Sequence, residues 1–220
     1  MTEYEVEPIP GLPGLLPPGE HILWQGSPDW RALARSAFHV RIVAGYFAVL
    51  AAWALASAVV TGVHGVADLK GVAMTIVVGF VGVGLLHLLA WGSARSTIYT
   101  LTNRRVVLRI GMALPKCINL PLGLIGSVDL AVRSDGSGDL PLTITGPQRL
   151  GYLALWPHAR PWKISTPQPM LRALPDGATI AAMIARTCLA ASPDGRIAQL
   201  ATPAEMPAEL MPSFGDAVTA

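Results

Sequence analysis

The sequence predicts an α+β membrane protein in which a two-helix transmembrane hairpin is followed by a small antiparallel β-barrel closed by a C-terminal helix. Three observations predict this fold class. Only 14% of the 220 residues are charged, against about 25% in an average soluble domain. Two uncharged runs are each long enough to cross a bilayer. Beyond them, apolar and polar residues alternate as they do in half-buried strands.

The chain begins with an acidic, proline-rich arm, residues 1–29, which carries no Lys or Arg. Its prolines interrupt any helix, so we expect an extended conformation. In residues 30–41, Trp30, Leu33 and Phe38 fall on one helical face and basic residues on another. This interfacial segment either lies on the membrane surface or extends the first span.

Residues 42–63 and 71–92 are the two predicted transmembrane helices, each with 22 residues and no charge. At 1.5 Å per residue, each covers a hydrocarbon core of about 30 Å. The connection His64–Lys70 is short, so the two helices should be antiparallel neighbours.

Basic residues flank the spans on one side, which predicts that both termini and the β-domain are cytoplasmic. The connecting loop carries Lys70 alone. The flanking residues are Arg31, Arg35 and Arg41 before the first span and Arg95, Arg104, Arg105 and Arg109 after the second.

Small residues recur along one face of each span, and such rows let helices approach closely in lipid. The rows either seal the hairpin itself or form a surface for other membrane helices or a second copy of the chain. They consist of Ala44, Ala48, Ala52 and Ala56 on the first helix and of Gly71, Thr75 and Gly79 on the second.

His87 is an ionisable residue inside the second span, where such residues are costly and often functional. It lies near the cytoplasmic end, where it can reach interfacial water. The alternative is that its neutral imidazole coordinates the magnesium of a bacteriochlorophyll-type pigment.

Residues 95–191 form the predicted β-domain, because the periodicity changes from helical to alternating there. A helix over about residues 179–189 should close it, and residues 192–220 should be a disordered tail. The expected strands are Ser96–Leu101, 105–110, Lys116–Leu120, 127–133, 140–145, Gly151–Leu155 and Trp162–Ser165.

Charge is segregated along the chain: residues 95–191 carry eleven basic and four acidic residues, whereas the arm and the tail are acidic. A basic domain beneath a membrane is attracted to anionic lipid heads, and Arg31, Arg35, Arg104 and Arg105 are the candidate contacts. An ordinary positive-inside bias explains the same balance. No basic run with interleaved aromatic residues indicates nucleic-acid binding.

No pattern typical of a catalytic, nucleotide-binding or metal site occurs in the sequence. The two cysteines, Cys117 and Cys188, are too few and too far apart for a disulfide framework or a zinc site. We therefore expect no enzymatic activity, no catalytic residues and no bound metal.

Two stretches resemble the membrane-anchored bacterial pleckstrin-homology-like (PH-like) proteins, and more narrowly the photosynthetic complex assembly proteins of purple bacteria. The first is LPPGEHILWQGSPDWRALARSAFHVR, residues 16–41, and the second is STIYTLTNRRVVLRIG, residues 96–111. The resemblance implies a PH-like β-domain without catalytic residues. It also implies a location on the inner, photosynthetic intracytoplasmic membrane and a role in assembling the reaction centre and its core light-harvesting complex.

The leading functional hypothesis is a non-catalytic assembly factor that binds reaction-centre and core-antenna subunits and contacts membrane lipids, with no cofactor. Its contact candidates are the two rows of small residues and three aromatic residues, Trp24, Trp30 and Phe38. Two alternatives remain: bacteriochlorophyll handling through His87, and a general lipid- or stress-related role typical of the broader PH-like proteins.

Overall fold

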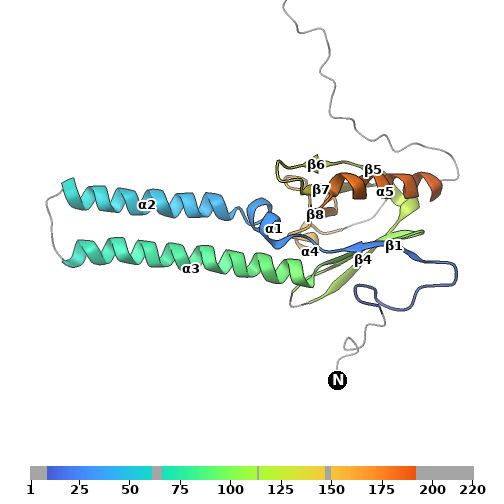
Figure 1. Ribbon diagram of the computed structural model, residues 1–220, viewed down its shortest axis with the longest axis horizontal. Coiled ribbons are helices and arrows are strands. Elements are labelled where there is room, and N and C mark those ends of the chain that lie inside the picture. The colour runs from blue at the N-terminus through green and yellow to red at the C-terminus, as the bar shows by residue number, and fades with distance from the viewer. Residues whose placement is uncertain (1–8, 61–65, 113, 147–149, 192–220) are drawn as a thin grey trace, which may run out of the picture.

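The computed structural model describes residues 9–60, 66–112, 114–146 and 150–191, and it shows a long helical hairpin with a β-domain at one end (Figure 1). The predicted disordered tail, residues 192–220, and the first eight residues of the arm lie outside the described residues. Two apolar helices combined with antiparallel sheets confirm the mixed α and β composition.

The hairpin consists of α2, Val40–Val60, and α3, Val66–Ser96, which run side by side (Figure 1). Both are long and apolar enough to cross a membrane, judged by length and composition. α3 begins earlier and ends later than its uncharged run, because helical hydrogen bonds continue through Asp68, Lys70 and Arg95. Residues 61–65 lie outside the described chain, so the predicted connection is seen only from Val66 onward.

The interfacial segment forms a separate helix, α1, Trp30–Ser36. Asp29 caps it, since the Asp29 carboxylate accepts hydrogen bonds from the backbone N–H groups of Arg31 and Ala32 at 3.1 and 3.3 Å. His39, with a φ of 52°, separates α1 from α2, so α1 is not an extension of the first span.

Protein, and not a lipid surface, covers the apolar face of α1. Leu33 and Ala34 are buried in a cluster with Ala90 and Ala94 of α3 and Ala173 of the β-domain. The helical periodicity correctly identified this face, but periodicity carries no information about which surface covers it.

The first sheet has the order β1-β2-β3-β4, and every pairing in it is antiparallel. Part of the arm that we expected to be extended is the edge strand β1, which pairs Gly26 with Tyr99 of β2. The four strands are β1, Ile22–Gly26, β2, Ile98–Thr102, β3, Arg105–Ile110, and β4, Lys116–Pro121.

A short 3₁₀ helix, η1, Leu122–Leu124, leads from β4 into the second sheet, in which β7 pairs with β5 and β6 on one side and with β8 on the other. Its strands are β5, Ile125–Val128, β6, Ala131–Val132, β7, Gly138–Ile144, and β8, Met170–Leu174.

The predicted closed barrel is wrong, because the described strands form two separate sheets with an apolar core between them. Helix α5, Gly177–Ala191, covers this core and contributes Ile180, Ile184 and Cys188. Burial raises the pKa of the Cys188 thiol to about 11 and keeps it protonated.

Two of the predicted strands are also wrong. Gly151–Leu155 contains the short helix α4, Tyr152–Leu155, and Trp162–Ser165 is irregular. The second sheet instead uses β8, which the sequence did not reveal. All five residues of β8 are buried, so its sequence lacks the alternation that identifies a half-buried strand.

A buried hydrogen-bond network holds the β-domain to the end of α3. The Thr97 hydroxyl donates to the Ser93 carbonyl at 2.7 Å, so its oxygen accepts from His158 Nε2 at 3.1 Å. His158 Nδ1 is then the acceptor for the Tyr99 hydroxyl at 2.7 Å, and Tyr99 Oη accepts the backbone N–H of Arg172 at 3.1 Å. Burial raises the pKa of Tyr99, which keeps this hydroxyl protonated as a donor.

The Arg172 side chain extends the network to α1. Its guanidinium donates to the carbonyls of Pro157 at 2.8 Å and Ser36 at 3.0 Å. Asp139 balances this buried charge, with its Oδ2 3.9 Å from Nε of Arg172, and it also pairs with Arg133. The hairpin, α1 and the β-domain are therefore joined at one buried polar centre.

We expect Gly138→Ala to destabilise the fold, because a Cβ on Gly138 would lie 2.8 Å from the Cα of Gly177 at the start of α5. The contact is with backbone, so the strain should lower the free energy of unfolding by about 1–3 kcal/mol. Urea unfolding in mild detergent measures this. Gly123→Ala is the matched control, since its Cβ would have no neighbour within 4 Å. If both variants lost the same free energy of unfolding, the close approach of Gly138 to Gly177 would be contradicted.

We expect His158 to make stability depend on pH. Burial, together with the nearby charge of Arg172, lowers the pKa of His158 from 6.5 to about 3. Below about pH 6.5 the unfolded chain gains a proton that the folded chain does not, so stability falls as pH falls, by about 1.4 kcal/mol per unit.

The measurement is unfolding of the wild type and of His158→Gln at about pH 6.5 and pH 5, above the usual carboxylate range. The wild type should lose about 2 kcal/mol more than the variant over this interval. Both proteins contain the remaining histidines, so the contributions of these histidines to the pH dependence of stability cancel in the comparison. If the free energy of unfolding changed equally with pH in the two proteins, His158 would be protonated equally in the folded and unfolded states, which would contradict the prediction.

Candidate functional site

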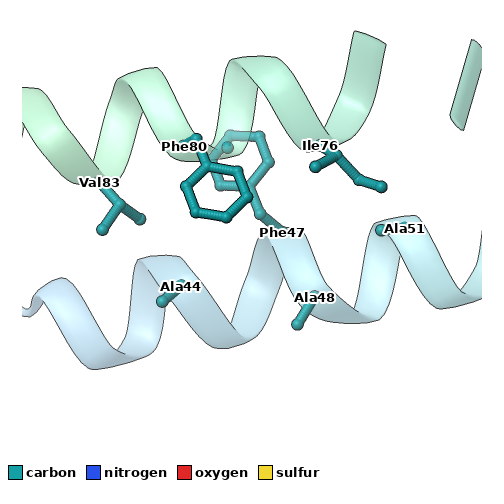
Figure 2. Close-up of a pocket in the computed structure, with 8 residues that line it drawn as sticks. Ala44, Phe47, Ala48, Ala51, Ile76, Phe80 and Val83 are labelled. Atoms are coloured by element: carbon teal, nitrogen blue, oxygen red, sulfur yellow. The ribbon is translucent and has the colours of Figure 1, made fainter. Parts of the chain in front are cut away.

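An apolar groove of about 280 Å³ lies between α2 and α3 (Figure 2). Beside the groove, Gly79 lets the two helices approach closely, since a Cβ there would lie 3.0 Å from Cβ of Phe47. Phe47 reaches from α2 toward α3, whereas Phe80 is 77% exposed and borders the groove from α3 (Figure 2). The lining residues are Ala44, Phe47, Ala48, Ala51, Ile76, Gly79, Phe80 and Val83.

The structure divides the predicted rows of small residues. Ala44, Ala48 and Gly79 line the groove, whereas Ala52 and Ala56 are exposed on α2 away from it. Gly71 is exposed, and a Cβ added there would meet no atom of the described residues within 4 Å. The Thr75 hydroxyl donates to the Gly71 carbonyl at 3.0 Å, which satisfies that hydroxyl within the helix.

Phe47 and Phe80 are groove residues that the sequence analysis missed. Both belong to uniformly apolar runs, in which no periodicity marks the side facing the partner helix. A glycine opposite an aromatic residue is recognisable only once the register of the two helices is known.

His87 is exposed on α3, and its Nδ1 lies 2.9 Å from the carbonyl oxygen of Val83. A carbonyl oxygen only accepts, so Nδ1 carries a proton, and in a neutral ring Nε2 would keep its lone pair. Among the described residues, none donates a hydrogen bond to Nε2. The Trp30 ring lies at its edge, with the ring centroids 6.4 Å apart.

The three aromatic contact candidates are mainly structural. Trp24 packs against the core of the β-domain, and Phe38 is buried in the α1 cluster, where its ring meets that of Trp156 edge to face at 5.6 Å. Trp30 is half-buried beside His87, with the Arg31 guanidinium 5.3 Å from its ring centroid.

The four candidate lipid contacts lie in two places. Arg31 and Arg35 are on α1, where Arg35 pairs with Asp135 at 2.6 Å. The hydrogen bonds from Ser137, and to a smaller extent the charge of Arg35, lower the pKa of Asp135. Arg104 lies in the β2–β3 turn and Arg105 is the first residue of β3, and β2 runs away from α3 toward that turn. Both are thus at the far end of β2 from the hairpin.

Arg105 is engaged within the protein, because its guanidinium donates to both carboxylate oxygens of Glu20 at 2.8 and 2.9 Å. Burial alone would raise the pKa of Glu20, but its hydrogen bonds with Arg105 and Thr102 lower it overall. The pair ties the segment before β1 to the β2–β3 turn, which is a structural role.

Comparison with known proteins assigns the family. A model of the bacterial PH domain matches residues 37–187, which spans both hairpin helices and the β-domain. A protein of Rhodobacter capsulatus, described as an uncharacterized 23.7 kDa protein in the puhA 5' region, is 39% identical over 189 residues, covering 86% of this chain and 88% of that protein. No solved structure matches the chain. The two matches together show that the chain belongs to the bacterial PH domain family.

Proposed function

We propose that this protein is a non-catalytic assembly factor for the photosynthetic reaction centre and its core light-harvesting complex, of the PuhB type. It binds membrane subunits during their assembly and releases them unchanged. Its hairpin spans the bacterial inner, photosynthetic membrane, and both termini lie in the cytoplasm.

The observation that carries this proposal is the relative from Rhodobacter capsulatus. Its name places it in the puhA 5' region, a photosynthesis-gene context, and the alignment covers nearly the full length of both chains. The resemblance of residues 16–41 and 96–111 to photosynthetic complex assembly proteins points in the same direction.

The shape of the hairpin supports binding to membrane subunits. Helices associate in lipid by close packing, because the apolar solvent supplies no hydrophobic drive between them. The groove beside Ala44 and Ala48 is a concave, apolar surface into which side chains of another membrane helix can fit. Outside the groove, α2 and α3 also expose large apolar residues, including Trp53 and Val81.

We expect Ala48→Phe to impair assembly, because the new ring would fill the groove. In a host strain from which the gene has been deleted, the wild-type chain should restore reaction centres, and Ala48→Phe should restore several-fold fewer. Ala52→Phe, in the same row but outside the groove, should restore close to the wild-type level. The measurement is the reaction-centre absorption of isolated membranes, compared at equal amounts of each variant protein.

Two outcomes would contradict this account. Reaction centres that accumulate normally in the deletion strain would remove the assembly function altogether. Equal restoration by Ala48→Phe and Ala52→Phe would keep the assembly function and exclude the groove as the contact.

A second candidate function is pigment handling through His87, and the geometry of this side chain favours it. Its Nδ1 is held by the Val83 carbonyl, so the free lone pair of Nε2 is available to a bacteriochlorophyll magnesium. The exposed position of His87 on α3 leaves room for such a ligand.

If His87 binds pigment, the protein purified in mild detergent from pigmented cells should show a bacteriochlorophyll absorption band. His87→Ala should remove that band, because no other ring nitrogen replaces Nε2 there. His21→Ala is the control, since this exposed histidine precedes β1, outside the hairpin. A wild-type spectrum without pigment, or a band that survives His87→Ala, would exclude this function.

A further inference from the structure

Apolar side chains of the β-domain lie level with the ends of the hairpin helices, on both sides of it. On the α3 side, the β3–β4 connection brings Met112 against Gly92, where a Cβ would lie 2.7 Å from the Met112 sulfur. Gly92 is the last residue of the uncharged run of α3. Met112, and Leu114 two residues further along the same connection, are therefore at the height where α3 would leave the hydrocarbon core.

On the α2 side, the corresponding residue is Trp156, which follows α4. Its ring contacts that of Phe38, two residues before α2 begins at Val40. Figure 1 shows α4 beside α1, at the end of the β-domain that adjoins the hairpin. Trp156 thus lies close to the point where α2 would enter the bilayer.

These three side chains are poorly covered by the protein. Met112 is 49%, Leu114 76% and Trp156 52% exposed. A soluble surface rarely keeps methionine, leucine and tryptophan exposed around one rim, whereas tryptophan is enriched where membrane meets water.

Basic residues lie beside these three exposed side chains, which together form an apolar rim. Arg41 is the second residue of α2, Lys116 is the first of β4, and Arg95 lies near the end of α3 with its guanidinium 5.8 Å from the centroid of the Trp91 ring. Basic residues beside apolar ones at this height match the headgroup region of an anionic bilayer.

We propose that Met112, Leu114 and Trp156 insert into the lipid surface and dock the β-domain directly on the bilayer from which its helices emerge. The ligand is a lipid surface and not a single lipid head, because the contact residues are apolar and lie on both sides of the hairpin. This inference rests on the proposed transmembrane position of α2 and α3.

The joint between hairpin and β-domain argues for lipid as the occupant. Thr97 alone separates the end of α3 from β2, and it is buried in the network with His158. A connection of one buried residue cannot lift the β-domain away from the membrane. If α3 spans the bilayer, the β3–β4 connection beside Gly92 must meet the lipid surface.

The test places a spin label on a single cysteine and measures its collisions with oxygen, which concentrates in lipid, and with a water-soluble nickel complex. The full chain is reconstituted into vesicles of phosphatidylcholine and phosphatidylglycerol. Cys117 is replaced by Ser, whereas the buried Cys188 can remain because its raised pKa keeps it unreactive.

The label in Leu114→Cys should collide mainly with oxygen, at a depth of about 5–10 Å within the boundary of headgroups and acyl chains. Leu15→Cys is the matched control: it is a leucine with 78% exposure in the segment before β1, and this segment pairs through Glu20 with Arg105, at the far end of β2 from the hairpin. Its label should collide mainly with the nickel complex.

Val49→Cys on α2 separates the two ways in which the inference can fail. If its label is in lipid while the Leu114 label resembles that of Leu15, the docking is overturned and the transmembrane hairpin stands. If the Val49 label is itself accessible to the nickel complex, the proposed membrane position of the hairpin fails, and the docking fails with it.

Discussion

The structure depends on the junction at which α3 becomes β2 with only Thr97 between them. Thr97, Tyr99 and His158 are buried there and satisfy one another's hydrogen bonds, and Arg172 carries the network to the end of α1. Removing one partner would leave a buried polar group unsatisfied, which costs more than the bond itself contributes. The hairpin and the β-domain therefore behave as one body, and the orientation of the first fixes that of the second.

Because the joint is rigid, the groove of the hairpin and the exposed apolar residues Met112, Leu114 and Trp156 keep fixed positions relative to each other. A helix packed against the groove of α2 and α3 would meet the β-domain at a fixed height and direction. The segment before α2 contributes to this arrangement, since α1 packs between α3 and β8 while β1 completes the first sheet. Both elements precede residue 37, where the match to the bacterial PH domain begins.

Local patterns of apolar and polar residues were sufficient to predict much of the fold. The uncharged runs identified both long helices, and strict alternation identified β3, because one face of that strand is buried and the other is partly open. The same logic failed for β8, whose five residues are all buried, and the strand predicted at residues 151–155 is a short helix. Ala44, Ala48 and Gly79 of the groove were found, but Ala51, Phe47 and Phe80 were not, since sequence gives no register between two uniformly apolar helices. The network around His158 joins residues that are far apart in the chain, so no local pattern could indicate it.

The first sheet draws β1 from before the hairpin and β2 from after it. During synthesis, β1 emerges from the ribosome long before its partner strand β2. The backbone groups of β1 cannot pair with β2 until the 71 intervening residues, 27–97, have been made. Both apolar helices are translated within that interval. Completion of the sheet is thus a checkpoint in biogenesis: a nascent chain can close it only after the whole hairpin has left the exit tunnel.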